Sequence, residues 1–185
     1  MNLSFGQKYD DDGLIMPWLT HDCLDEIKRM ELSGKNILAF GGGLGDAWLS
    51  RRCKKLMVIE RDEDWLIKAA FYGASNGVNS IEYLHRPCKE GSGRAGYYTE
   101  IPNGFSPNVI INDDIYRTEV VEMAINYFKS IGGGVLISDN YWQDFVWKSP
   151  KAIEMLKVFK KKIFPQKNHT NHNGNKWKTA IHYIE

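Results

Sequence analysis

Five short apolar runs, rich in β-branched residues, alternate with helical patterns along the chain, and this alternation constrains the fold most strongly. The runs cover residues 36–40, 56–60, 80–84, 108–112 and 134–138. They lack a regular polar–apolar alternation, which is typical of strands buried on both faces of a sheet. Helical patterns cover residues 22–32, 62–74 and 118–131, the last with Thr118 as its N-cap, and another starts at residue 149. Together they predict βαβ units, in which helices cover both faces of a parallel sheet.

The C-terminal end has a different pattern. Residues 162–164 and 178–184 are strand-like, and the polar segment 166–176 joins them, which predicts a closing antiparallel hairpin. We therefore expect an α/β, Rossmann-like domain with a seven-stranded, mostly parallel sheet. A single domain over residues 1–185 would comprise an N-terminal segment and helix (1–35), the βα units (36–140), and a C-terminal helix and hairpin (141–185).

Composition limits the classes of partner. The 185 residues carry a net charge of +1, so no global charge favours nucleic acid or membranes. No apolar run is long enough for a membrane span, the polar start is unlike a signal peptide, and three scattered cysteines form no disulfide or zinc pattern. A cytoplasmic protein is expected. The charge is uneven, however: residues 157–178 hold seven Lys and no acid, whereas the other 163 residues hold 17 basic and 23 acidic side chains.

A glycine-rich turn follows the first expected strand. Gly41, Gly43 and Gly45 let the backbone approach a ligand closely, and the next helix offers free N–H groups. The second strand ends in Glu60, whose carboxylate can accept both hydroxyls of a ribose. A dinucleotide fold prefers G-x-G-x-x-G, but here the third glycine comes one residue earlier. That spacing and the C-terminal hairpin favour S-adenosylmethionine. The alternative is a tight turn beside a solvated glutamate.

Three segments carry a family resemblance: Phe40–Asp46, Val58–Trp65 and Trp177–Tyr183. Through them the chain resembles the class I S-adenosylmethionine-dependent methyltransferases, and the small bacterial and viral methyltransferase-like proteins most of all. The resemblance implies that the cofactor is held by Gly41, Gly43, Gly45, Glu60, Arg61 and Asp113. One departure is Ala39, where the family often has an acidic residue that serves the methionine end of the cofactor.

Acidic side chains follow the fourth and fifth strands. Asp113 follows the fourth expected strand, and Asp139 and Asn140 follow the fifth. The carboxyl ends of neighbouring parallel strands meet at one edge of a sheet, so these three side chains should lie close together. Two carboxylates and an amide oxygen suit Mg²⁺, so these three residues are the expected metal ligands. The pattern is similar to that of metal-dependent O-methyltransferases, where a cation stabilises the acceptor oxygen. The alternative is that both aspartates cap the elements that follow.

The same residues are the expected catalytic group. We expect Asp113 and Asp139 to act with Tyr116, which stands where those O-methyltransferases place a lysine base. The segment Asn112–Ile115 lacks the prolines and the aromatic residue of the usual N-methylating nucleic-acid enzymes.

The sequence favours methylation of a hydroxyl on a small molecule or sugar, with Mg²⁺ as a candidate helper and no membrane partner. Two alternatives stay open: a nucleic-acid methyltransferase that uses the Lys-rich segment, and a non-catalytic S-adenosylmethionine-binding or interaction protein. Since 185 residues leave little room for a substrate domain, selectivity would come from loops, a partner chain, a second copy, or the N-terminal segment 13–20. We expect Leu14, Ile15, Met16 and Trp18 of that segment to pack over the cofactor mouth or the sheet edge.

Overall fold

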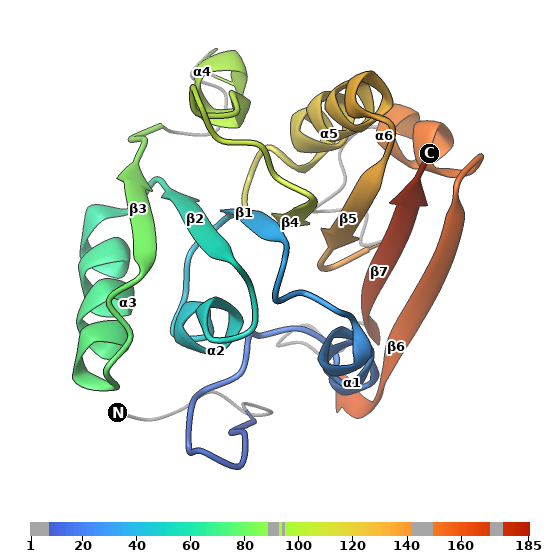
Figure 1. Ribbon diagram of the computed structural model, residues 1–185. Helices are drawn as coiled ribbons and strands as arrows, with labels where there is room; N and C mark the ends of the chain where they lie inside the picture. Colours follow the sequence, from blue (N-terminus) through green and yellow to red (C-terminus); the bar gives the residue numbers. More distant parts are fainter. Residues whose placement is uncertain (1–7, 89–92, 94, 142–149, 171–175) are drawn as a thin grey trace.

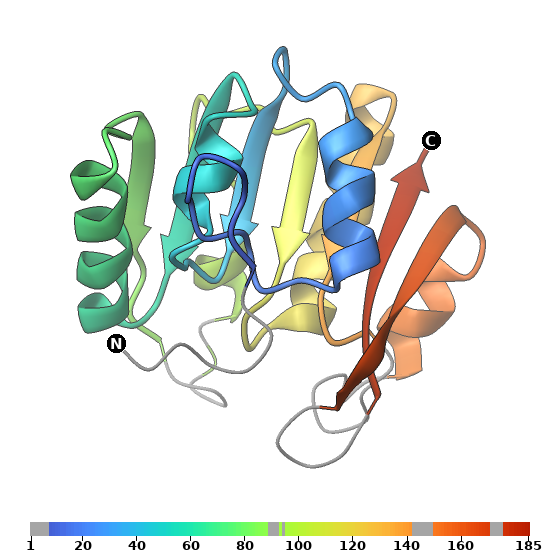
Figure 2. The same ribbon diagram turned by 90° about the horizontal axis from the view of Figure 1, so that it is seen from below.

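The computed structural model describes residues 8–88, 93, 95–141, 150–170 and 176–185. It contains one seven-stranded sheet in the order β3-β2-β1-β4-β5-β7-β6. Strands β1 to β5 are parallel, whereas β7 runs antiparallel to β5 and β6 antiparallel to β7. In Figure 2 the arrowheads of β1 to β4 point one way and that of β7 points the other way. The expected Rossmann-like sheet with its C-terminal antiparallel hairpin is confirmed.

The strands are β1 (Asn36–Phe40), β2 (Lys55–Glu60), β3 (Ile81–His85), β4 (Val109–Asn112), β5 (Gly134–Ser138), β6 (Lys160–Thr170) and β7 (Lys176–Ile184). The helices are α1 (His21–Arg29), α2 (Asp46–Ser50), α3 (Glu63–Ser75), α4 (Ala95–Thr99), α5 (Arg117–Ile131) and α6 (Pro150–Leu156). The helices form two layers: α1, α2 and α3 cover one face of the sheet, and α4, α5 and α6 cover the other (Figure 1).

Alternating side chains of the central strands enter two separate cores. On β1, Ile37 and Ala39 pack with α1 and α2, whereas Leu38 and Phe40 pack with α5 and α6. This explains why the strands read as continuous apolar runs: both faces are buried, so neither face selects polar residues. The sheet is therefore a rigid support, and its carboxyl edge presents the loops that carry the candidate site.

Three details differ from the sequence expectation. Helix α5 begins at Arg117 after Tyr116, so Thr118 lies inside the helix and is not its N-cap. Strand β6 extends to Thr170, with an irregular register between Pro165 and Thr170, where a loop was expected. Short α4 begins at Ala95, within a stretch that had no predicted element. Among the described residues, no helix has the length and apolar character needed to cross a membrane.

Candidate active site

The glycine loop turns tightly at the carboxyl end of β1. Gly41 has φ +88°, and a Cβ atom there would lie 2.3 Å from the carbonyl oxygen of Asp113, so only glycine fits. A Cβ on Gly45 would lie 2.4 Å from Pro17. Gly43 differs, because no atom of the described residues lies within 4 Å of the place its Cβ would take. The outer glycines thus allow close packing against neighbouring segments, while Gly43 exposes its backbone to open space.

Glu60 lies at the end of β2, beside this loop, and is only 5% exposed. Its Oε2 accepts the N–H of Gly42 at 2.8 Å, and its Oε1 accepts the N–H groups of Arg61 and Asp62, both at 2.8 Å. Burial raises the pKa of Glu60, and these hydrogen bonds oppose the rise. A carboxylate offers about four acceptor positions. Three are used, which leaves room for one ligand hydroxyl on Oε2 rather than the two expected.

Asp46, whose role was not predicted from the sequence, is buried and stabilises the glycine loop. Its Oδ2 accepts the N–H of Gly43 at 2.9 Å, and burial raises its pKa to about 7. The signal was present in the sequence, because an aspartate directly after a glycine turn can accept a hydrogen bond from a backbone N–H a few residues earlier. On the outer side, the indole of Trp65 donates to the carbonyl oxygen of Gly42 at 2.6 Å while its ring stays partly exposed. The loop is therefore braced by a buried carboxylate and by an aromatic ring.

Asp113 follows β4 and is held by a buried arginine. Nη2 of Arg117 donates to Asp113 Oδ1 at 2.7 Å, and 34% of the aspartate side chain stays exposed. Within the described part of the chain, Asp113 Oδ2 has no hydrogen-bond partner. Removal from bulk water raises the pKa of Asp113, the charge of Asp139 raises it further, and Arg117 opposes both. One carboxylate oxygen is thus fixed and the other remains available to a ligand.

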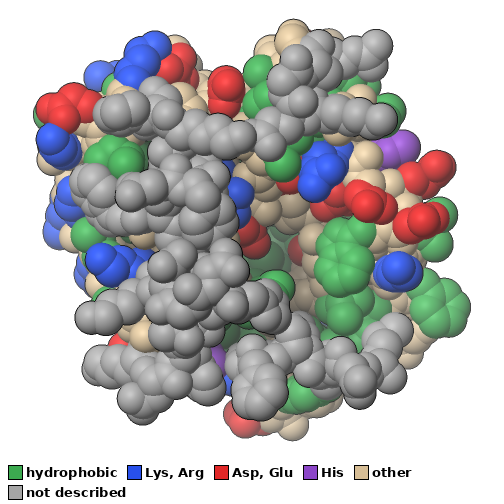
Figure 3. Space-filling model, turned by 180° about the vertical axis from the view of Figure 1, so that it is seen from behind, with side chains coloured by type: hydrophobic (Ala, Val, Ile, Leu, Met, Phe, Trp, Pro, Cys, Tyr) green, Lys and Arg blue, Asp and Glu red, His purple; other side chains and the backbone are tan. Residues whose placement is uncertain are grey.

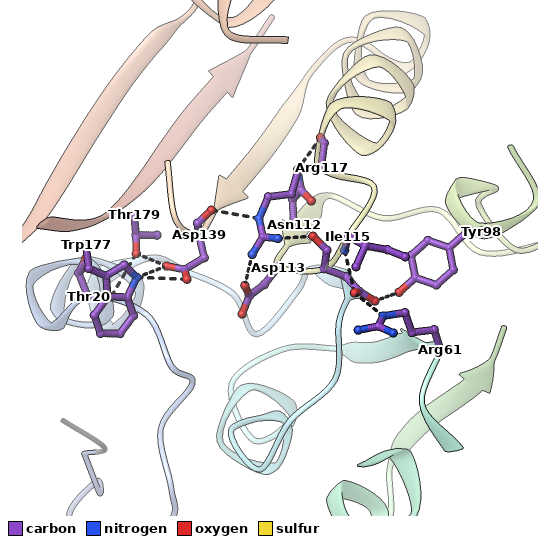
Figure 4. A network of polar contacts seen from close by, with 11 residues as sticks. Thr20, Arg61, Tyr98, Asn112, Asp113, Ile115, Arg117, Asp139, Trp177 and Thr179 are labelled. Atoms are coloured by element: carbon purple, nitrogen blue, oxygen red, sulfur yellow. Dashed lines mark hydrogen bonds and ion pairs between the residues drawn. The ribbon is translucent and has the colours of Figure 1, made fainter. Parts of the chain in front are cut away.

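Asp139, after β5, is fully engaged by the C-terminal hairpin and is only 2% exposed. Nε1 of Trp177 donates to its two oxygens at 2.9 and 3.1 Å, and the hydroxyl of Thr179 donates to Oδ1 at 2.7 Å. Burial raises the pKa of Asp139 to about 6, although both donors oppose the rise. In Figure 4, Asp139 and its partners Trp177 and Thr179 lie on one side of Arg117, and the carboxylate of Asp113 lies next to the Arg117 guanidinium.

These contacts do not fit the expected Mg²⁺ site. The Arg117 guanidinium already provides a positive charge at Asp113, and Asp139 directs its oxygens at Trp177 and Thr179. Asn140 adopts a left-handed backbone, φ 52°, and is partly exposed. No group of three acidic, His or Cys side chains suited to a metal occurs in the described residues. The metal expectation for Asp113, Asp139 and Asn140 is therefore not carried forward, because Arg117 occupies Asp113 Oδ1 and both oxygens of Asp139 accept hydrogen bonds from the hairpin.

The expected base, Tyr116, lies elsewhere. It is 7% exposed and packs among the apolar residues of α5, with its ring 5.6 Å from that of Tyr98. A phenol packed into the core is poorly placed to take a proton from a ligand, so Tyr116 is not retained as the base. The next residue, Arg117, is the one that contacts the site, because its guanidinium donates to Asp113. Tyr141, three residues after β5, is fully buried, with its ring 5.2 Å from that of His182.

A second cluster joins β4 to β2. Asp114 Oδ1 accepts from Arg61 Nε at 3.0 Å, and its other oxygen accepts from the hydroxyl of Tyr98 on α4. Figure 4 shows Arg61 and Tyr98 of this cluster on the opposite side of Arg117 from Asp139. Arg61, which the resemblance assigned to the cofactor, is therefore used in an ion pair beside the glycine loop. It links the strand ends that flank the expected cofactor position.

The N-terminal segment crosses the same edge. Leu14, Ile15 and Met16 are buried, as expected, and Pro17 packs on Gly45. The N–H of Thr20 then donates to Thr179 Oγ1 at 3.1 Å, which fastens the segment to the hairpin. Figure 3 views the molecule from the side of the strand carboxyl ends, where the surface is hollowed near its centre and shows acidic, basic and hydrophobic side chains around the hollow.

The chain was compared with family models, with curated proteins and with solved structures. No family model and no curated protein matches the sequence. Solved structures do match. A putative O-methyltransferase from Klebsiella pneumoniae has a TM-score of 0.64 at 18% identity, with 94% of this chain and 85% of that chain covered. The O-methyltransferase TomG from Streptomyces achromogenes, in complex with S-adenosylmethionine, has a TM-score of 0.60 at 16% identity, with 98% and 93% covered. An rRNA methylase from Streptococcus thermophilus has a TM-score of 0.60 at 15% identity, with 89% and 96% covered.

The chain has the class I methyltransferase fold. At these identities the likeness shows the fold alone. The methyltransferase fold places ligands at the carboxyl edge of its sheet, which is where the glycine loop, Glu60 and Asp113 meet. Because the three similar proteins differ in the acceptors that their names suggest, the acceptor of this chain has to be argued from its own residues.

Proposed function

We propose that the protein is an S-adenosylmethionine-dependent methyltransferase that acts on a hydroxyl group of a small molecule, with Asp113 as the base. The observation that carries the proposal is the carboxylate of Asp113, fixed through Oδ1 by Arg117 while the side chain stays one-third exposed. The carbonyl oxygen of Asp113 lies directly against Gly41 of the glycine loop. The proposed base and the loop proposed to hold the cofactor are therefore adjacent.

The glycine loop fits S-adenosylmethionine. The open space at Gly43 admits a ligand against the backbone, and Glu60 has one acceptor position left for a ribose hydroxyl. When bound, S-adenosylmethionine would supply a methyl group activated by a positively charged sulfur. No phosphate has to be accommodated, which agrees with a glycine turn shorter than the dinucleotide motif.

The chemistry left to the protein is alignment and removal of one proton. Asp113 Oδ2 accepts the proton of the acceptor hydroxyl, and Arg117 keeps the carboxylate in position. The pKa of Asp113 is raised by burial and by Asp139, and a carboxylate with a raised pKa is a stronger base than an ordinary one. Asp139 does not touch the reacting atoms in this proposal, because it holds Trp177 and Thr179 of the hairpin.

The experiment is a comparison of wild type with Asp113→Asn. Asparagine keeps the shape of the side chain, so we expect calorimetry to detect S-adenosylmethionine binding to both proteins. Turnover of a panel of hydroxylated small molecules, followed as S-adenosylhomocysteine release, should fall by about 10²–10⁴-fold. The matched control is Asp25→Asn, a partly exposed aspartate on α1 that pairs with Lys28 and should change neither quantity. Full turnover by Asp113→Asn would contradict the proposed base, and wild type that binds cofactor without any turnover would favour a non-catalytic binding protein.

A nucleic-acid acceptor is supported less well. Two lysines of the Lys-rich segment are already paired, Lys157 with Glu154 and Lys162 with Glu26. Phosphate binding by the remaining lysines would make affinity for RNA or DNA fall steeply with salt. The absence of salt-dependent binding to either polymer would remove this alternative.

A further inference from the structure

Trp18 is a large apolar side chain that stays half exposed on a tightly held segment. Its relative exposure is 50%, although Leu19 and Thr20 directly after it are buried. The N–H of Leu19 donates to the carbonyl oxygen of Pro17 at 2.8 Å, a three-residue turn centred on Trp18. The backbone is therefore fixed on both sides of an exposed indole. A fixed, exposed aromatic ring offers contact area at a low cost in conformational entropy, as binding sites do.

The position of the ring relative to the proposed reaction follows from its neighbours. Trp18 meets Trp177 with ring centroids 6.0 Å apart and planes at 78°. Trp177 donates to Asp139, whose carbonyl oxygen accepts from Arg117 at 3.4 Å, and Arg117 in turn holds Asp113. An unbroken set of contacts thus joins the exposed indole to the proposed base.

The contacts of the glycine loop also place Trp18 near Asp113, independently of the hydrogen bonds described above. One end of the loop, Gly45, packs on Pro17, the residue before Trp18, and the other end, Gly41, packs on Asp113. Trp18 and Asp113 therefore flank one short loop, with the expected cofactor beside it. A ring stacked on Trp18 would lie on the same edge of the sheet as Asp113.

The base limits which hydroxyl can react. A carboxylate without a metal ion removes a proton readily only from a fairly acidic hydroxyl, and aromatic hydroxyls have a pKa near 10, as in tyrosine. Sugar and other aliphatic hydroxyls are far less acidic and need stronger activation than a carboxylate supplies. The carboxylates here are not arranged to hold an activating cation, because Asp113 Oδ1 is held by Arg117 and the oxygens of Asp139 accept from Trp177 and Thr179. The exposed indole and the arginine-paired carboxylate of Asp113 therefore favour the same class of acceptor, a flat ring with an acidic hydroxyl.

We propose that Trp18 is the stacking platform for the methyl acceptor and that the acceptor is an aromatic compound carrying a hydroxyl group. This inference rests on the proposed methyltransferase function and narrows its substrate class. Trp18 is then a specificity-determining residue: it orients the ring so that the hydroxyl reaches Asp113. Its removal should weaken acceptor binding and leave cofactor binding intact.

The test uses 2-naphthol and its saturated counterpart decahydro-2-naphthol as matched probes, with S-adenosylhomocysteine present. Indole N–H signals of the ¹⁵N-labelled protein are assigned by single Trp→Phe variants. We expect 2-naphthol to shift the Trp18 signal in a saturable manner, at least fivefold more than the saturated probe does. The signal of Trp48, which is fully buried, serves as the control for general structural change. An unshifted Trp18 signal, or equal shifts with both probes, would overturn the inference.

Variants complete the test. Trp18→Ala should weaken 2-naphthol binding at least tenfold, whereas Trp18→Phe should keep most of it because an aromatic ring remains. Both should bind S-adenosylmethionine like wild type, which calorimetry measures separately. If wild type binds the cofactor but Trp18→Ala binds 2-naphthol unchanged, the inference fails and the proposed function stands. If wild type does not bind the cofactor, the proposed function itself fails.

Discussion

Single residues in the site are explained by partners that are distant in the sequence. The glycine loop, Glu60 and Asp113 were predictable, because each lies at the end of a recognisable strand. The partners of Asp139 were not: Trp177 and Thr179 lie 38 and 40 residues away, on a strand whose register only the folded sheet defines. From the sequence alone, which does not give that register, Asp139 was interpreted as a metal ligand. Tyr116 was misplaced for a similar reason, because one residue along the chain decides whether a side chain faces the core or the site.

Asp139 gives a pH-dependent prediction. Its ordinary pKa is 3.8, and in the folded protein it rises to about 6, so the folded state disfavours the charged form. The contribution of Asp139 to stability is therefore largest below pH 4 and is lost as the pH rises from about 4 to about 6. Asparagine does not titrate. The free energy of unfolding of wild type, relative to Asp139→Asn, should fall by roughly 1–3 kcal/mol between pH 4 and pH 7.

Urea unfolding across this pH range measures the difference. The same series with Asp113→Asn as background separates Asp139 from its charged neighbour. A difference that stays flat, or that grows as the pH rises, would show that Asp139 is not a carboxyl with a raised pKa.

At the scale of elements, the sequence predicted most of the fold because each strand and helix carries its own local pattern. Buried runs predicted β1 and β5 without error and the other parallel strands to within one residue. The start of α5 and the length of β6 were wrong. Tyr116 precedes α5 without a side-chain cap, and β6 is prolonged by pairing with β7 rather than by an apolar pattern. Tertiary contacts outweighed the local signal at both places.

Thr179 joins three elements and gives a prediction at this scale. Its hydroxyl donates to Asp139 after β5 and accepts the N–H of Thr20 before α1. Thr179→Val keeps the shape but leaves the buried N–H of Thr20 without its acceptor and removes one of the two donors to Asp139 Oδ1, so it should destabilise the protein by roughly 1–3 kcal/mol. Thr179→Ser keeps the hydroxyl and loses one methyl group, which costs about 1 kcal/mol. Thermal and urea unfolding compare the two, and an equal loss in both variants would mean that the hydroxyl contributes nothing.

At the scale of the whole molecule, one edge of the sheet brings together the residues of the proposed site. The glycine loop after β1, Glu60 after β2, Asp113 after β4 and the N-terminal segment all meet there. The sequence predicted this convergence from the general rule for parallel sheets. It did not predict that the N-terminal segment is fastened to the C-terminal hairpin, because that contact joins residues 159 positions apart. The proposed site thus lies at the edge of a sheet that is buried on both faces, beside the N-terminal segment and the C-terminal hairpin.

The central claim is that the glycine loop binds S-adenosylmethionine, and Gly43 allows a direct test. In the part of the chain that the structure describes, a side chain at Gly43 meets no atom within 4 Å of its Cβ, so Gly43→Val should fold normally but fill the space proposed for the cofactor. Gly34, equally open and before β1, gives the matched control Gly34→Val. We predict that calorimetry detects S-adenosylmethionine binding to wild type and Gly34→Val, and at least a tenfold loss in Gly43→Val at an unchanged melting temperature. No binding to wild type, or equal binding to Gly43→Val, would contradict the account.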